Sequence, residues 1–104
     1  MIAEYNPVVY ERWLGPNDPA VPPGEMRIFK VDGQLEAVDF RCPCGCGAEC
    51  YTPVTPMNEP KQERHWQFDE ATTTLSPSVR YLGGCKAHFN ITNGKTVMHG
   101  DSGK

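Results

Sequence analysis

Glycines and prolines place the tightest limit on what this chain can fold into. Its 104 residues include ten of each, and both disfavour helices, glycine through its backbone freedom and proline through its missing amide donor. The sequence therefore excludes a helix bundle. Hydrophobic residues make up 38% of the chain, which is too many for a disordered protein but leaves a thin core for one domain of this length. We expect the fold to need a further stabilising element.

Short apolar runs separated by turn residues predict β-hairpins. Asp32-Gly33 and Asn93-Gly94 each lie between two such runs, and both dipeptides are typical of tight turns between antiparallel strands. We expect Ser76-Pro77-Ser78-Val79 to interrupt a strand that resumes at residues 81–82. The expected strands cover residues 26–31, 35–40, 49–54, 65–69, 72–75, 89–91 and 96–98. The predicted fold class is mostly β, a small antiparallel sheet or sandwich built from hairpins.

The chain divides into three expected parts. Residues 1–24 form an N-terminal arm with a connector rich in proline, residues 25–99 form a metal-binding β domain, and residues 100–104 form a frayed tail. Proline fixes φ and removes a hydrogen-bond donor, so we expect the connector to be extended. We expect the apolar side chains of the arm to pack on its own domain, with docking on a partner as the alternative. These side chains are Tyr5, Tyr10, Trp13 and Leu14.

The cysteines predict a metal site. Three of the five fall within Cys42-Pro43-Cys44-Gly45-Cys46, and an odd number packed this closely fits a disulfide framework poorly. About forty residues later, Cys85-Lys86-Ala87-His88 has the spacing that lets one turn aim two donors at one ion. The two clusters therefore predict a closed, tetrahedral structural zinc site that would stabilise the thin core.

Five side chains compete for the four zinc positions. They are Cys42, Cys44, Cys46, Cys85 and His88. We favour Cys44, Cys46, Cys85 and His88, with Cys42 either exchanging with one of them or lying just outside the coordination sphere. We interpret Cys50 as a packed or free thiol, and His65 and His99 as surface residues.

An iron–sulfur cluster is the alternative to zinc. The second loop of a Rieske centre has a Cys-x-x-His step like that of Cys85 and His88, but its first loop needs a Cys-x-His pair that this chain lacks. A two-iron cluster with three cysteines and one histidine is still chemically possible, because thiolates and imidazole suit both metals. An electron-transfer protein is therefore the alternative function.

Patterns typical of enzymes are sparse in this sequence. Cys85 and His88 could act as nucleophile and base, so a Cys-dependent enzyme is a second alternative, but the neighbouring thiols favour metal ligation. The sequence carries no phosphate-binding glycine loop of known spacing and no His-Glu-x-x-His helix. We interpret Ser76-Pro77-Ser78 as a turn or strand end with a structural role. We therefore name no catalytic residue and expect binding rather than catalysis.

The charge and hydropathy of the chain limit its partners. A net charge of -3 and a pI near 5.5 supply no broad cationic surface, which argues against general nucleic-acid binding. The N-terminal residues lack a secretory signal, and no apolar stretch approaches the roughly 20 residues of a membrane span. We expect a soluble, cytoplasmic protein with no membrane contact.

Several motifs follow one another in a fixed order from residue 26 to residue 98. They are Phe40-Arg41-Cys42-Pro43-Cys44-Gly45-Cys46-Gly47, Trp66-Gln67-Phe68, Thr74-Leu75-Ser76-Pro77-Ser78-Val79 and the run from Cys85 to Gly94. This succession resembles an uncharacterised, small, Cys-rich metal-binding family of bacteria and their phages. Some members resemble companions of bacterial ubiquitin-like conjugation genes, and some carry an ammonia monooxygenase label that these residues do not support.

The resemblance implies that the five Cys and His candidates belong to the family pattern, and it implies no reaction. It also implies a bacterial cell, including a phage-infected one, as the setting. The sequence as a whole thus predicts a small zinc-binding accessory or interaction protein, bacterial or phage-encoded, that binds another protein.

Overall fold

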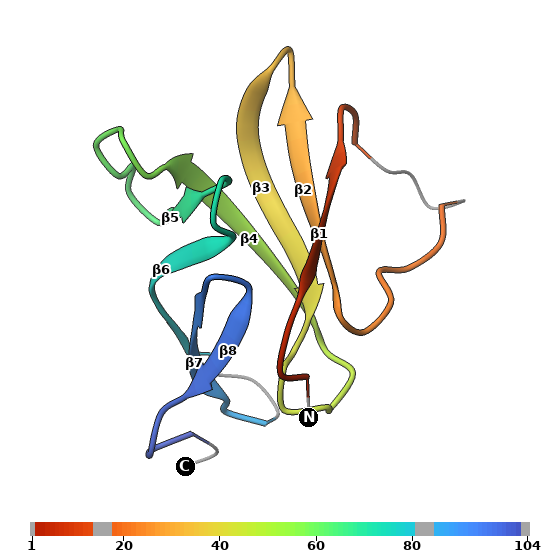
Figure 1. Cartoon of the computed structure of the whole chain (residues 1–104), viewed down its shortest axis with the longest axis vertical. Helices are drawn as coiled ribbons and strands as arrows, with labels where there is room; N and C mark the ends of the chain where they lie inside the picture. The colour runs from red at the N-terminus through yellow and green to blue at the C-terminus, as the bar shows by residue number, and fades with distance from the viewer. Residues whose placement is uncertain (1, 14–17, 81–84, 103–104) are drawn as a thin grey trace.

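The computed structural model describes residues 2–13, 18–80 and 85–102. Within these ranges the chain forms strands and turns and no helix, which confirms the mostly β class. Figure 1 shows that the strands make one sheet that curls like half of a barrel. The strands are β1 (Asn6–Tyr10), β2 (Glu25–Val31), β3 (Gln34–Arg41), β4 (Glu49–Pro56), β5 (Trp66–Asp69), β6 (Thr74–Arg80), β7 (His88–Thr92) and β8 (Lys95–Met98).

Strands that are neighbours in the sheet are also neighbours in the sequence, in the order β1-β2-β3-β4-β5-β6-β7-β8. Most pairs are antiparallel, but β1 pairs with β2, and β4 with β5, in parallel. Parallel neighbours need a crossover connection instead of a tight turn, and these pairs are joined by the long segments 11–24 and 57–65. The sheet is therefore mixed.

The two predicted hairpin turns have the backbone that their sequences favour. Asp32 and Gly33 have φ angles of 53° and 76°, and Asn93 and Gly94 have φ angles of 52° and 76°. Two consecutive left-handed residues are the mark of a tight hairpin turn whose twist matches that of its strands. These turns join β2 to β3 and β7 to β8, as predicted.

The β6 strand continues through the segment that the sequence analysis expected to interrupt it. Thr74–Arg80 is one strand, which contains a cis peptide bond between Ser76 and Pro77. Its pairing with β7 shifts register between Leu75 and Val79. The proline is thus accommodated by an irregularity within the strand. Residues 81–82 lie outside the described residues.

The first residues of the chain lie against its last strand. The backbone amide of Tyr5 donates to the carbonyl of Gly94, and that of Thr96 donates to the carbonyl of Ala3, both at 2.8 Å. Glu4 and Lys95 form an isolated antiparallel bridge between these segments. The curl of the sheet thus brings its two ends into contact.

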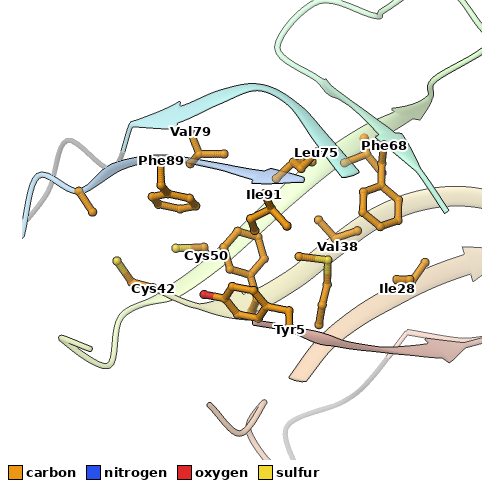
Figure 2. Close-up of a cluster of buried hydrophobic side chains, with 14 residues drawn as sticks. Tyr5, Ile28, Val38, Cys42, Cys50, Phe68, Leu75, Val79, Phe89 and Ile91 are labelled. Carbon is orange, nitrogen blue, oxygen red and sulfur yellow. The ribbon is translucent and has the colours of Figure 1, made fainter. Parts of the chain in front are cut away.

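The core fills the concave side of the curled sheet (Figure 2). Its largest side chains are Phe40, Phe68 and Phe89, each at most 1% exposed. Phe40 meets the rings of Tyr5 and Phe89 edge to face, at centroid distances of 5.3 and 6.1 Å. Cys42 is buried in the same cluster, so the core reaches the cysteine loop.

The connector packs on the opposite, outer face of β2 and β3. Arg27 donates to the backbone carbonyls of Pro19 and Ala20 at 2.7 and 3.4 Å, and Arg41 donates to that of Val21 at 2.8 Å. The arm also packs on the chain itself, since the rings of Tyr10 and Trp13 contact that of Phe29. Leu14 lies outside the described residues.

In the described ranges, no helix has the length and apolar character needed to cross a membrane.

Candidate functional site

Four cysteine side chains gather where the core meets the loop between β3 and β4. The Sγ atoms of Cys42, Cys44, Cys46 and Cys85 all lie within 4.8 Å of one another. The Sγ of Cys42 lies 3.4 Å from that of Cys44 and 3.5 Å from that of Cys85. All four are free thiols. They therefore form a group that could hold one metal ion.

The backbone of the 42–46 loop turns its thiols toward one point. The amide of Cys42 donates to the carbonyl of Ala48 at 2.8 Å, which holds the two ends of the loop together. Gly45 has a φ of 92° and Gly47 one of 84°, a region that side chains with a Cβ rarely adopt. The Cys46 amide donates to the Cys44 Sγ at 3.4 Å. The loop thus presents three sulfurs to the single cysteine that precedes β7.

The thiols of this group have opposite pKa shifts. Burial raises the pKa of Cys42 and of Cys44. A backbone hydrogen bond from Ala48 lowers the pKa of the exposed Cys46 thiol to about 7. A bound cation would favour the thiolate form of all four, because metal ligation requires deprotonated sulfur.

The structure brings together four of the five ligands predicted from the sequence, including Cys42. The ring of His88, the fifth candidate, contacts Ser78 and Asp101 instead. Cys50 is buried in the core, and burial raises the pKa of its thiol to about 12. It lies outside the group of four.

His88 lies between a serine and an aspartate. Its Nε2 atom is 2.9 Å from the Oγ of Ser78, and its Nδ1 atom is 2.7 Å from Oδ1 of Asp101. Ser78 comes from β6, His88 from the start of β7, and Asp101 from the turn after β8. A hydroxyl, an imidazole and a carboxylate in this order form the arrangement of a catalytic triad.

Neighbouring residues hold the aspartate and the histidine of this arrangement. Arg80 donates to Oδ2 of Asp101, and the backbone amide of His88 donates to the Ser102 hydroxyl at 3.1 Å. The ring of His99 stacks on that of His88 at a centroid distance of 4.2 Å. These contacts hold the turn after β8 against the start of β7.

The protonation states follow from the hydrogen bonds. The hydrogen bond from His88, together with the charge of Arg80, holds the pKa of Asp101 below its usual range. An ionised Asp101 accepts the Nδ1 proton of His88, which leaves Nε2 free to accept the proton of the Ser78 hydroxyl. The side chain of His88 is 20% exposed, so a substrate could reach this edge of the molecule.

Neither Ser78 nor Asp101 is among the functional residues predicted from the sequence. Ser78 lies in a segment interpreted as structural, and Asp101 lies in the expected frayed tail. In the structure, residues 100–102 form a turn. The separations in sequence match no short motif, since Ser78 and His88 are ten residues apart and His88 and Asp101 are thirteen apart. Only the pairing of β6, β7 and β8 brings the three together.

Comparison with known protein families gives a match over most of the chain. The family model described as "Bacterial ubiquitination-like system serine protease (BubE)" matches residues 15–99. This range includes Ser78, His88 and the four cysteines of the group, and it ends two residues before Asp101. No curated protein and no solved structure matches the chain.

Proposed function

This chain belongs to the BubE family of bacterial ubiquitination-like system serine proteases, and on that premise we propose that it is a serine protease. Ser78 is the nucleophile, His88 the general base, and Asp101 the residue that orients His88. The observation that carries the proposal is the continuous hydrogen-bond path from the Ser78 hydroxyl through both ring nitrogens of His88 to the Asp101 carboxylate.

The geometry supports acyl transfer. His88 Nε2 takes the proton of Ser78 as the Oγ atom attacks the substrate carbonyl carbon. The protonated imidazole, stabilised by Asp101, then gives this proton to the leaving amine as the C–N bond breaks. Water attacks the resulting acyl-serine with His88 again as base, which releases the carboxylic acid and restores the Ser78 hydroxyl.

The proposed substrate is a polypeptide of a bacterial ubiquitination-like system, as the family description indicates. Such a substrate agrees with the protein partner expected from the sequence. The proposed location is the bacterial cytoplasm, where thiols such as the four clustered cysteines stay reduced. A role in binding alone remains the competing function, and it needs no reactive serine.

We further propose that Cys42, Cys44, Cys46 and Cys85 bind one structural zinc ion. Four thiolates at Zn–S distances of about 2.3 Å in a tetrahedron lie about 3.8 Å from one another. The observed separations of 3.4 and 3.5 Å, with all pairs within 4.8 Å, fit this set. A two-iron cluster would spread its ligands over two metal centres, so the compact group favours a single ion.

The proposed zinc would support the catalytic residues without touching the substrate. Cys85 lies three residues before His88. An ion held by Cys85 and by the 42–46 loop would therefore fix the start of β7 against the end of β3. A Cys₄ site has no open position for a substrate or for water, so the ion takes no part in the reaction.

A fluorophosphonate probe tests the proposed protease. Such probes form a covalent bond with activated serines, so we expect stoichiometric labelling of the native protein and none of a Ser78→Ala variant. Ser76→Ala is the matched control, because Ser76 lies on the same strand outside the triad, and it should label like the native protein. Labelling of Ser78→Ala at the native rate would contradict the proposal. Absence of labelling in the native protein would favour the function in binding alone.

Elemental analysis tests the proposed metal. One zinc ion per chain is expected in freshly purified protein and is expected to be lost in Cys42→Ser. Cys50→Ala, which changes a buried thiol outside the group, should retain it. Iron with acid-labile sulfide and visible absorbance would establish the iron–sulfur alternative instead.

A further inference from the structure

The outer face of the sheet carries a cavity that has no part in the proposed catalysis. It measures about 300 Å³ and lies over β2, β3 and β4, where the connector crosses them. None of its lining residues belongs to the triad or to the four-cysteine group. The volume is at the lower end for ligand pockets, which suits a single side chain better than a cofactor.

Aromatic rings form the walls of this cavity. Trp13 packs on Phe29 at a centroid distance of 5.3 Å and approaches Tyr51 at 6.3 Å. Both rings are nevertheless exposed, Trp13 at 47% and Tyr51 at 55%. Large aromatic side chains are more often buried in a core. Exposed aromatic rings that line one cavity offer stacking surfaces for a flat cation.

Two carboxyl groups belong to the same cavity. Asp39 from β3 and Glu49 from β4 both line it. Asp39 is only 5% exposed, and its Oδ1 atom has no hydrogen-bond partner among the described residues. Burial, with the hydrogen bond and the charge of Glu49, raises the pKa of Asp39 to about 7. A buried carboxylate with one unpaired oxygen and a second carboxyl group beside it is costly, so this cavity would gain from a donor that carries positive charge.

The arginines near the cavity already have partners of their own. Arg27 donates to Glu25 at 2.8 Å and to two connector carbonyls. Arg41 donates to the carbonyls of Val21 and Gly47 at 2.8 and 2.9 Å. Both side chains hold the rim of the cavity in place, and neither forms a hydrogen bond with Asp39 among the described residues. The rim is therefore already ordered, and an external cation would meet the exposed carboxyl group of Glu49 with that of Asp39 beside it.

We propose that this cavity is a docking site for an arginine side chain of a protein partner. Arginine fits better than lysine, because its planar guanidinium both stacks on aromatic rings and donates two parallel hydrogen bonds to carboxylates. The guanidinium packs on the exposed rings of Trp13 and Tyr51 and donates to Asp39 and Glu49. The site is independent of the proposed protease, because it shares no residue with it.

Nuclear magnetic resonance of the full chain tests this site with N-acetyl-arginine amide as the probe, at pH 8. The two tryptophans, Trp13 and Trp66, give separate indole N–H signals. We expect the Trp13 signal to shift with increasing probe and the Trp66 signal to stay in place. N-acetyl-citrulline amide has nearly the same shape without the charge, and it should bind at least about tenfold more weakly. N-acetyl-lysine amide should also bind more weakly than the arginine probe.

Variants complete the test. Asp39→Asn and Tyr51→Ala should each weaken binding of the arginine probe at least about tenfold, while labelling of Ser78 by a fluorophosphonate stays at the native rate. Glu36→Gln, a surface change outside the cavity, should leave binding unchanged. Equal binding of arginine and citrulline probes, a response of Trp66 alone, or undiminished binding by folded Asp39→Asn would each overturn the proposal.

Discussion

The Oδ1 atom of Asp101 lies 2.7 Å from the Nδ1 atom of His88, so a turn beyond the last strand completes a site that begins on β6. The side chain of Asp101 is 54% exposed. A contact with a carboxylate this exposed contributes little to stability. Its contribution is therefore to orient the histidine ring, and the two effects can be separated by experiment.

Replacing Asp101 with asparagine should impair catalysis and leave the fold intact. The amide group no longer stabilises the protonated His88 and can favour the wrong tautomer, so we expect kcat to fall on the order of 100-fold or more. Thermal unfolding should stay within about 2 °C of the native protein, because the lost pair is exposed. Asp32→Asn in the β2–β3 turn is the control, since asparagine tolerates its left-handed backbone. A native kcat in Asp101→Asn would contradict the assignment.

Loss of the proposed zinc should lower stability and activity together. Cys85→Ser removes one ligand three residues before His88, so we expect the midpoint of thermal unfolding to fall by at least about 10 °C. Fluorophosphonate labelling of Ser78 should slow at temperatures where the variant is still folded. A chelator should do the same to the native protein. Cys50→Ala should lose stability through its small cavity but keep its sensitivity to the chelator, and insensitivity of the native protein would exclude a structural ion.

The stability of the protein should depend on pH through Asp39. Its pKa is raised from 3.8 to about 7 on folding, so between these values the folded protein binds more protons than the unfolded chain. The free energy of unfolding contributed by Asp39 therefore falls as the pH rises through this window and is constant above it. One proton limits this slope to about 1.4 kcal/mol per pH unit.

Asp39→Asn removes this dependence. Urea unfolding of the native protein and the variant between pH 5 and pH 8 measures the pH dependence. Because both proteins carry the same thiols, comparing them at each pH cancels the contributions of the thiols. We expect the variant to gain stability relative to the native protein as the pH rises. A constant difference across the window would show that Asp39 does not titrate there.

A side chain at position 94, in place of Gly94, should lower the stability of the protein. The φ of Gly94 is 76°, and a Cβ atom would lie 3.3 Å from the carbonyl oxygen of Tyr5, which belongs to the segment that contacts β8. Gly94→Ala should therefore destabilise the protein by about 1 to 2 kcal/mol in urea unfolding. Gly100→Ala is the control, because nothing lies within 4 Å of a Cβ atom there. Equal stability of the two variants would contradict the close approach.

The hairpins could be predicted from sequence because their signals are local. Asp32-Gly33 and Asn93-Gly94 determine a turn within two residues, and the flanking alternation determines the strands. The parallel pairing of β1 with β2 and of β4 with β5 could not be predicted in the same way. Long connections carry no turn signal, and what places β1 is the packing of Tyr5 on Phe40 and of Tyr10 on Phe29.

The sequence also identified the members of the four-cysteine group as candidates, because three of them share one loop. The spacing did not indicate that His88 would lie beside Ser78. Cys85-x-x-His88 predicts a pair of metal ligands even where the histidine ring contacts other residues. Two residues of spacing allow both side chains to reach one ion, but they do not require it. Here β7 begins at His88, and its pairing with β6 carries the ring to Ser78.

The order of the strands has a consequence for how the chain folds. Each strand pairs with its neighbours in sequence, so most of the sheet can assemble without closing long loops, and low contact order favours rapid folding. Contacts between segments far apart in the sequence break this rule, among them the contact of residues 3–5 with residues 94–96, the packing of Phe40 on Phe89 and the approach of Cys85 to the 42–46 loop. Each carries a large loop-closure entropy. We therefore expect them to form late in folding and to determine its rate, and Ser78 and His88 acquire their final positions only when β7 is in place.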